Sequence, residues 1–357
     1  MTSSLVGSEM CIRDRCMIEY ERNKKNIHRT EVVVMKWMDM HCDTVSELFK
    51  KRSEGTLWKN NLCVDIERLK KSDSVAQFFA CYVNVVEYPG WEESFDAAEK
   101  LIQSVHEEES KEFCVAGSAA ELKAAQQVKK YAGILTVEEG GVLNGKAERV
   151  EQLYEQGVRL LTLTWNYENC IGSPNSRDTE VMQRGLKPFG IEVVRRMNEL
   201  GMLVDVSHLS DGGFWDCIRY STAPVVASHS NCRELCRHPR NLTDEMLRAV
   251  GEKGGVVGLN FYSAFLTEKK ERAGLEMLAE HAKRMIRMAG EDVVALGTDF
   301  DGFERKDLPE KLEGAESMEL VWDAFQKAGI SSRQAEKIAY GNLFRVIEEE
   351  CGKTSVF

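Results

Sequence analysis

Short apolar runs alternate with longer amphipathic segments from residue 36 onward, and this alternation limits the possible folds more than any other feature. Eight runs have the length and apolar content of buried strands: 36–41, 77–83, 132–138, 159–164, 203–207, 225–228, 255–260 and 293–298. Helical spacing of apolar residues marks segments between them, for example 94–110, 188–200 and 275–289. This order predicts a parallel (β/α)8 barrel, the TIM-barrel fold. An open doubly wound sheet is the alternative, but no G-x-G-x-x-G follows the first predicted strand.

Side chains that commonly bind metals stand where several of these strands end. They are His41 and Asp43, Glu138 and Glu139, Asp205 and His208, His229, and Asp299 and Asp301. Imidazole and carboxylate groups suit a divalent metal such as zinc, and barrel active sites lie at the carboxyl ends of the strands. Each group alone has a structural interpretation, such as a hydrogen-bonded histidine, a turn at Asp301 or a helix N-cap at Asp205. Together, five strand ends predict a site for two metal ions.

Composition narrows the class of protein. The net charge of −11 disfavours a nucleic-acid partner held by phosphate contacts. No run approaches the roughly 20 apolar residues of a membrane span. Eleven cysteines without a C-x-x-C pair indicate reduced thiols in a cytoplasmic enzyme. We expect residues 1–34 to be a disordered or non-native, adapter-like extension, Met35 to be the native start, and residues 35–357 to form one catalytic domain.

Nine short stretches resemble the renal, or membrane, dipeptidase family of metallopeptidases, a branch of the amidohydrolase superfamily (peptidase family M19). They read MHCDT (40–44), VEEGG (137–141), LTLTWN (161–166), DVSHLS (205–210), SHS (228–230), HPRN (238–241), GLNFY (258–262), GTDFDG (297–302) and GN (341–342). The resemblance extends from residue 36 to about residue 350, and the order and spacing of the stretches are more specific than any one of them. Tryptophan followed by asparagine in the third stretch is similar to a bacterial subgroup of the family.

The resemblance implies a zinc-dependent dipeptidase with two zinc ions per chain. His41 and Asp43 would hold the first ion, His208 and His229 the second, and Glu139 would bridge the two. A hydroxide between the ions would attack the peptide carbonyl, and Asp299 would carry the proton from the water to the leaving amine. The substrates would be free dipeptides, and the resemblance also implies a homodimer.

The resemblance also assigns the substrate-binding residues. Arg240 would bind the free carboxylate of the dipeptide through two parallel hydrogen bonds, and Tyr262 would add a third. Better-known members carry a histidine where this chain has Trp165, so Trp165 or the following Asn166 is expected to contact the substrate instead. Two alternatives stay open: another binuclear amidohydrolase, such as an N-acyl amino-acid deacylase or a lactonase, and a metal-binding barrel without catalysis.

Overall fold

The computed structural model describes residues 35–51, 54–269 and 271–352. The contacts of the chain divide it into two units, 1–35 and 36–357, and the second is described below. The expectation that residues 1–34 are a disordered or non-native extension lies outside the described residues and stays a prediction.

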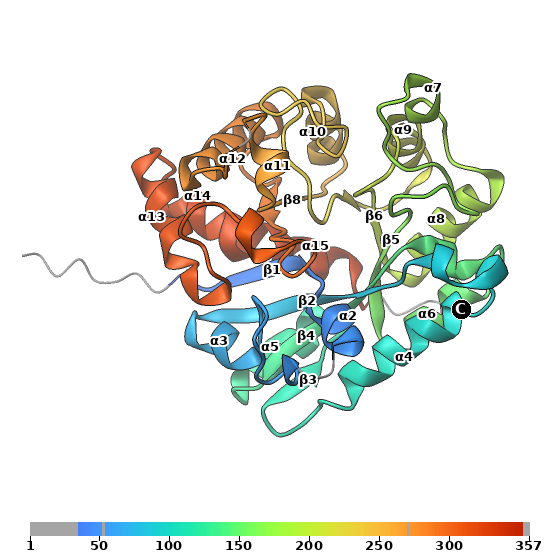
Figure 1. Cartoon of the computed structure of the whole chain (residues 1–357), viewed down its shortest axis with the longest axis horizontal. Helices are drawn as coiled ribbons and strands as arrows, with labels where there is room; N and C mark the ends of the chain where they lie inside the picture. The colour runs from blue at the N-terminus through green and yellow to red at the C-terminus, as the bar shows by residue number, and fades with distance from the viewer. Residues whose placement is uncertain (1–34, 52–53, 270, 353–357) are drawn as a thin grey trace, which may run out of the picture. The chain divides into compact units, whose positions relative to one another are not determined.

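Parallel strands form the centre of this unit (Figure 1). The strands are β1 (Trp37–Cys42), β2 (Ser74–Tyr82), β3 (Phe113–Val115), β4 (Tyr131–Glu138), β5 (Val158–Thr162), β6 (Leu203–Asp205), β7 (Val225–Val226), β8 (Val257–Leu259) and β9 (Val294–Leu296). One sheet has the order β1-β2-β4-β5-β6-β7, and β8 pairs with β9. Parallel bridges from Ala227 to Val257 and from Cys42 to Phe300 join the two sheets at both ends. The strands therefore curl into the predicted α/β barrel.

The short strand β3 was not predicted. It pairs with the first residues of β4 and lies off the main strand order. Three residues are too few for a periodic pattern, so this pairing depends on the neighbouring strand and not on its own sequence. The eight predicted strands correspond to the other eight, although most of the observed strands are shorter.

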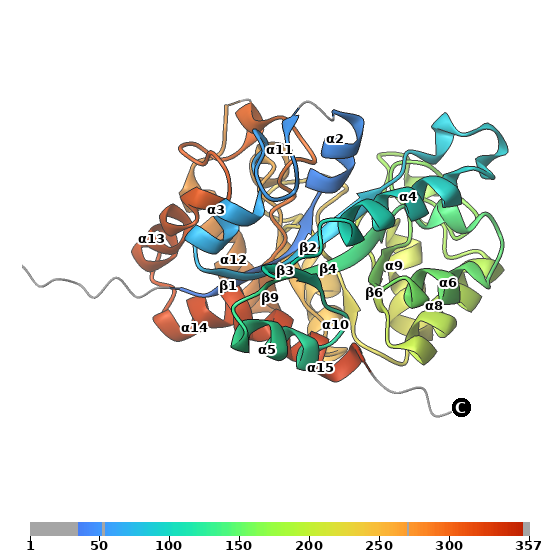
Figure 2. The same ribbon diagram turned by 90° about the horizontal axis from the view of Figure 1, so that it is seen from below.

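Helices cover the outside of the barrel (Figures 1 and 2). They are α2 (Thr44–Lys50), α3 (Ile66–Lys71), α4 (Ser94–His106), α5 (Ala119–Gln127), α6 (Arg149–Glu155), α7 (Thr179–Met182), α8 (Pro188–Leu200), α9 (Asp211–Tyr220), α10 (Asp244–Glu252), α11 (Ser263–Leu266), α12 (Leu275–Ala289), α13 (Glu319–Lys327), α14 (Ser332–Glu336) and α15 (Asn342–Glu350). Contacts join α6, α8, α9, α10, α12 and α13 in chain order. Local sequence sets their ends: for example, the Thr243 side chain accepts from the backbone N–H of Met246 and caps α10.

One end of the barrel is closed by apolar packing. Met38 of β1 and Phe78 of β2 belong to a buried cluster with Val346 and Ile347 of α15. The carboxyl ends of the strands lie at the opposite end of the barrel and carry the polar side chains that were predicted from the sequence. The apolar end therefore provides a rigid base for a polar site.

Candidate metal centre and active-site cavity

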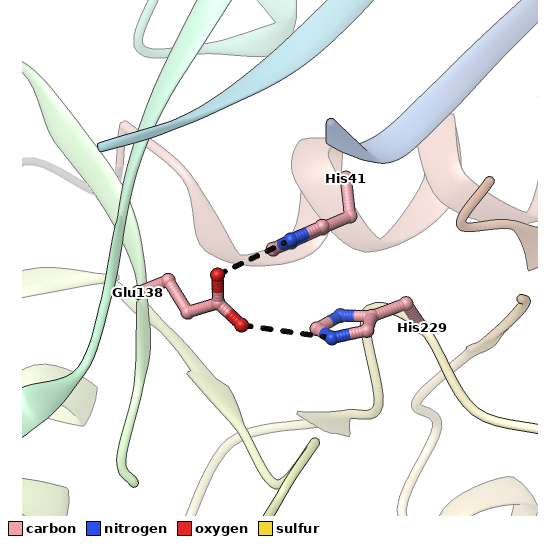
Figure 3. A group of neighbouring side chains, drawn as sticks. All are labelled: His41, Glu138 and His229. Atoms are coloured by element: carbon pink, nitrogen blue, oxygen red, sulfur yellow. Dashed lines mark ion pairs between the residues drawn. The ribbon is translucent and has the colours of Figure 1, made fainter. Parts of the chain in front are cut away.

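Three histidines surround one carboxylate at the carboxyl ends of the strands. Figure 3 shows this carboxylate, Glu138, with His41 and His229. His41 lies on β1, Glu138 is the last residue of β4, and His208 and His229 follow β6 and β7. One Glu138 oxygen, Oε2, is 3.5 Å from Nε2 of His41. The other, Oε1, is 3.2 Å from Nε2 of His208 and 3.7 Å from Nε2 of His229. A carboxylate placed in this way can bridge two metal ions.

The strand register explains why Glu138 takes this place. Glu138 is in register with Thr162 of β5, and Thr162 is in register with Asp205 of β6. Residues in register on parallel strands project from the same face. The Thr162 hydroxyl donates to Oδ2 of Asp205 at 2.6 Å. Asp205 also accepts from Ser228, which contacts His229, so this face is the inside of the site. Glu138 therefore points toward the histidines.

The expectation that Glu139 bridges the metals is corrected by this geometry. Glu139 has a left-handed backbone, with φ of 100°, at the turn from β4 into the 3-10 helix Gly140–Leu143. Its carboxylate accepts from the backbone N–H of Gly141 and Trp165 and from the side-chain amide of Asn169, at 2.6, 2.9 and 2.5 Å. The carboxylate is thus engaged away from the histidines. Two adjacent glutamates looked equivalent in the sequence, because the alternation of side chains places them on opposite faces of a strand but does not say which face is the inside.

Hydrogen bonds fix the ring orientation of His229. The Ser228 hydroxyl donates to Oδ2 of Asp205 at 2.6 Å and lies 2.7 Å from Nδ1 of His229. Because its one proton points to Asp205, this hydroxyl must accept the proton of Nδ1. The lone pair of His229 Nε2 then faces the site. Asp205 and Ser228 thus orient His229, a task that the sequence did not assign to them, although Asp205 stood at a predicted strand end.

His208 is oriented in the same way. Its Nδ1 lies 3.1 Å from Oδ1 of Asn166, an oxygen that only accepts, so Nδ1 carries the proton. Its Nε2 lies 3.0 Å from Nε2 of His229. Burial, together with the charges of Arg240 and His41, lowers the pKa of both rings well below the ordinary value for histidine. Two neutral rings thus turn their lone pairs toward each other, an arrangement that a cation between them would stabilise.

A second group of ligand atoms adjoins the first. Nε2 of His41 lies 3.3 Å from Oδ2 of Asp43 and 3.9 Å from Oδ1 of Asp299, and the three residues could hold a metal ion. Both ring nitrogens of His41 are buried and lack a hydrogen-bond partner among the described residues. Burial opposes a charge on His41, yet Glu138 and Asp43 still raise its pKa well above the ordinary value. This acidic cluster therefore favours a cation, and its donor atoms fit one.

Asp299 is held at the edge of this group. Its Oδ2 accepts from the side-chain amide of Asn260 at 2.8 Å. Burial, with a further contribution from Asp43, raises the pKa of Asp299 to about 7 against the opposing effect of His41. Its backbone is left-handed, as is that of His208, with φ of 60° and 66°. Backbone strain of this kind is common where a fold fixes functional side chains.

Asp301 has a structural role. It accepts from the Thr44 hydroxyl at 2.6 Å and from the backbone N–H of Cys63 at 2.7 Å. These hydrogen bonds tie the segment after β9 to the start of α2 and to the loop before α3. The interpretation of Asp301 as part of a turn agrees with these contacts.

A cavity of about 570 Å³ opens over the cluster. Its lining includes the predicted substrate-binding residues Trp165, Asn166, Arg240 and Tyr262, together with Asp299, which was expected to carry the proton and also to contact the substrate. Arg240 is 5% exposed and donates to the backbone carbonyl of His229 at 3.0 Å and to the Ser230 hydroxyl at 3.3 Å. Its Nε is buried without a hydrogen-bond partner among the described residues. The cavity therefore holds a cationic donor beside the metal-ligand cluster.

An α/β barrel with histidines and carboxylates gathered at the carboxyl ends of its strands, under a cavity, defines the protein as a metal-dependent hydrolase of the amidohydrolase type. Residues 25–355 match the model of the membrane dipeptidase family, peptidase family M19, and the chain belongs to that family.

Similarity to known proteins supports this assignment. An uncharacterized dipeptidase of Schizosaccharomyces pombe is 30% identical over 300 residues, which cover 79% of this chain and 71% of that protein. A Klebsiella pneumoniae protein, described as an uncharacterized protein in the pqqA 5′ region, is 36% identical over 240 residues, or 65% of this chain and 86% of that protein. The crystal structure of a Rhodobacter sphaeroides metallopeptidase, liganded with a phosphinate mimic of the dipeptide L-Ala-D-Ala, is 25% identical. That likeness has a TM-score of 0.79 and covers 88% of this chain and 99% of that one.

These findings identify the protein as a hydrolase of the metallo-dipeptidase type. None of the described helices has the length and apolar character needed to cross a membrane. Among the described residues, eight cysteines are free thiols: Cys42, Cys63, Cys81, Cys114, Cys170, Cys217, Cys232 and Cys236.

Proposed function

We propose that the protein is a zinc dipeptidase that binds two zinc ions and hydrolyses free dipeptides. The observation that carries the proposal is the placement of three histidine Nε2 atoms around the two oxygens of Glu138. His41 and Asp43 would hold one ion and His208 and His229 the other. Glu138, in place of Glu139, would bridge them.

Zinc at this site would supply an activated water and polarise the peptide carbonyl. The residues of the chain have separate tasks. Asp299 would take the proton of the attacking water and deliver it to the leaving amine, because its Oδ1 lies at the edge of the metal-ligand cluster, 3.9 Å from Nε2 of His41. Asn260 would keep Oδ2 of Asp299 in place, which leaves Oδ1 facing the cluster.

Substrate recognition would depend on Arg240. Its unpartnered Nε supports the binding of a carboxylate, since a buried guanidinium can give such a group two parallel hydrogen bonds. Tyr262 packs against Phe265 and Phe303 and lines the same cavity, so we assign it a contact with the C-terminal half of the dipeptide. Trp165 and Asn166 line the cavity beside Tyr82 and His208 and would contact the other half.

We also infer a cytoplasmic location, because free cysteines are typical of a reducing compartment. A homodimer is inferred from the family resemblance, and sedimentation of the purified protein tests it.

Metal analysis combined with turnover tests the proposal. The purified protein should carry about two zinc ions per chain, lose turnover with a chelator, and cleave unblocked dipeptides but not longer peptides. The panel should include L-Ala-D-Ala, since a mimic of this dipeptide binds the Rhodobacter sphaeroides relative. No turnover with any dipeptide of the panel would refute the assignment.

Glu138→Gln tests the bridging role directly. Loss of a group that hydrogen-bonds to a metal ligand typically weakens metal binding by about 10–100-fold, so loss of a direct ligand should weaken zinc binding and turnover by more than about 100-fold. Glu155→Gln, which changes an exposed carboxylate at the end of α6, is the matched control and should behave as the wild type. Wild-type zinc binding by the Glu138→Gln variant would contradict the bridging role.

Arg240 would also suit an N-acyl amino acid, which has the same free carboxylate. Turnover of a dipeptide and of its N-acetyl form separates the two activities. A dipeptidase should strongly prefer the free amine, whereas a deacylase should prefer the acylated substrate.

A further inference from the structure

Glu139 is fully buried beside the metal-ligand cluster and contacts none of its histidines in the described structure. It accepts three hydrogen bonds, two of which come from the segment after β5, at Trp165 and Asn169. The third comes from Gly141, where a Cβ would lie 2.5 Å from Oε1 of Glu139. Burial of a carboxylate and a left-handed backbone both cost free energy of folding. The place of Glu139 therefore requires a functional explanation.

The contacts of Glu139 hold one turn in place over the site. The Asn169 amide bonded to Glu139 also donates to the backbone carbonyl of Leu163 at 2.9 Å. Both ends of the stretch 163–169 are therefore tied to one point. Asn166 lies in the middle of this turn, with its side-chain oxygen 3.1 Å from Nδ1 of His208.

This geometry connects Glu139 to His208 through Asn166. Asn166 is exposed, so packing around its side chain does little to hold it. Its position depends on the backbone of the turn, whose neighbouring N–H, that of Trp165, donates directly to Glu139. The Trp165 ring packs against Tyr82, with ring centroids 4.8 Å apart, and the same hydrogen bond fixes where that ring enters the cavity.

We propose that Glu139 is a positioning residue that holds the 163–169 turn so that Asn166 keeps the proton of His208 on Nδ1. His208 then presents the lone pair of Nε2 to the second metal ion. This inference rests on the proposed metal site. The inference also assigns a role to Asn166. This residue follows Trp165, which stands where better-known members of the family carry a histidine.

Zinc affinity of the second site tests the proposal through a double-mutant cycle. Asn166→Ala and Glu139→Gln should each lower the affinity for the second zinc ion by about 10-fold, the lower range for loss of a group that orients a metal ligand. Because both act through one hydrogen bond, the double variant should lose no more than either single one. Glu168→Gln is the matched control, since Glu168 lies in the same turn but pairs with Arg184 and Lys187 on the surface, and it should bind zinc as the wild type does.

Two results would overturn the proposal: unchanged zinc affinity in Asn166→Ala, or losses that multiply to about 100-fold in the double variant. Asn166 is exposed, so Asn166→Ala is expected to fold even if Glu139→Gln does not. Turnover by Glu139→Gln should fall mainly through kcat, because Glu139 does not line the cavity and the dipeptide carboxylate is bound elsewhere, at Arg240.

Nitrogen-15 spectra of the metal-free protein, labelled at histidine, provide a readout independent of zinc. The wild type should show a protonated Nδ1 on His208, assigned by comparison with His208→Gln, and both single variants should lose this preference. An unprotonated Nδ1 in the wild type would overturn the inference. A wild type that shows the expected proton but binds no zinc would refute the proposed function and leave the positioning role supported.

Discussion

Replacement of Arg240 by glutamine tests how the cavity recognises a dipeptide. A guanidinium has five N–H donors. Two hydrogen bonds are already directed to the carbonyl of His229 and the hydroxyl of Ser230. Three donors remain, and one of them belongs to the buried, unpartnered Nε. Arg240 can therefore bind both oxygens of a substrate carboxylate without breaking the contacts that hold it.

The expected magnitude follows from these donors. A hydrogen bond to a charged group contributes about 1.5–3 kcal/mol, so two of them contribute about 3–6 kcal/mol. Since about 1.4 kcal/mol corresponds to a factor of ten, Arg240→Gln should lower kcat/KM for a free dipeptide by about 10²–10⁴-fold. Arg240→Lys keeps the positive charge but not the paired donors, so its kcat/KM should lie between those of the wild type and Arg240→Gln.

The assay compares a dipeptide with its C-terminal amide. The wild type should prefer the free acid by a similar factor, and Arg240→Gln should lose this preference while its low activity on the amide changes little. Zinc content must be measured in each variant, because Arg240 lies next to His229 and its charge lowers the pKa of His208 and His229. Arg237→Gln, at an exposed position in the same loop, is the control. An equal loss on acid and amide, with zinc intact, would refute carboxylate binding by Arg240.

Three further predictions concern the site and the stability of the barrel. Gly302→Ala should reduce turnover by about 100-fold, as misplacement of reacting groups by about 1 Å does, because the new Cβ would overlap Oδ1 of Asp299 and lie 2.5 Å from Oδ2 of Asp43; unchanged steady-state kinetics would contradict this. Asp299→Asn should retain zinc, measured by metal analysis, and reduce kcat by at least about 100-fold, because the amide cannot transfer the proton; zinc loss would instead make Asp299 a ligand. Asp244→Asn should lower the free energy of unfolding at pH 7 by about 0.5–1 kcal/mol, because Asp244 forms a partly exposed double contact with Arg284. The hydrogen bond from Arg284 lowers the pKa of Asp244 below its unfolded value. The contribution of Asp244 to the free energy of unfolding is therefore present above about pH 4 and is lost as the pH falls through the folded pKa. Urea titrations should show a difference in this free energy between wild type and variant at pH 7, and the difference should disappear at pH 3.

The sequence determined the barrel and most of the polar groups at its carboxyl ends. Strand and helix patterns are local, because burial of one face imposes a period of two on strands and 3.6 on helices. His41, Asp43, His208, His229 and Asp299 could be named because each follows an apolar run, and the fold brings them together. The order of the motifs also identified the family correctly.

The tertiary structure decided what local pattern could not. Glu138 and Glu139 are chemically identical neighbours, and only the register with Thr162 of β5 and the left-handed turn at Glu139 direct Glu138 to the histidines. The pairing of β3 with β4 depends on the neighbouring strand in the same way.

The orientation of the histidine rings is likewise a tertiary property. Asp205, acting through Ser228, sets the proton of His229, and Asn166 sets that of His208. These partners lie 23 to 42 positions apart in the chain, apart from the adjacent pair Ser228 and His229. No sequence period can encode such contacts, because they arise only when closure of the barrel brings the ends of separate strands to one place.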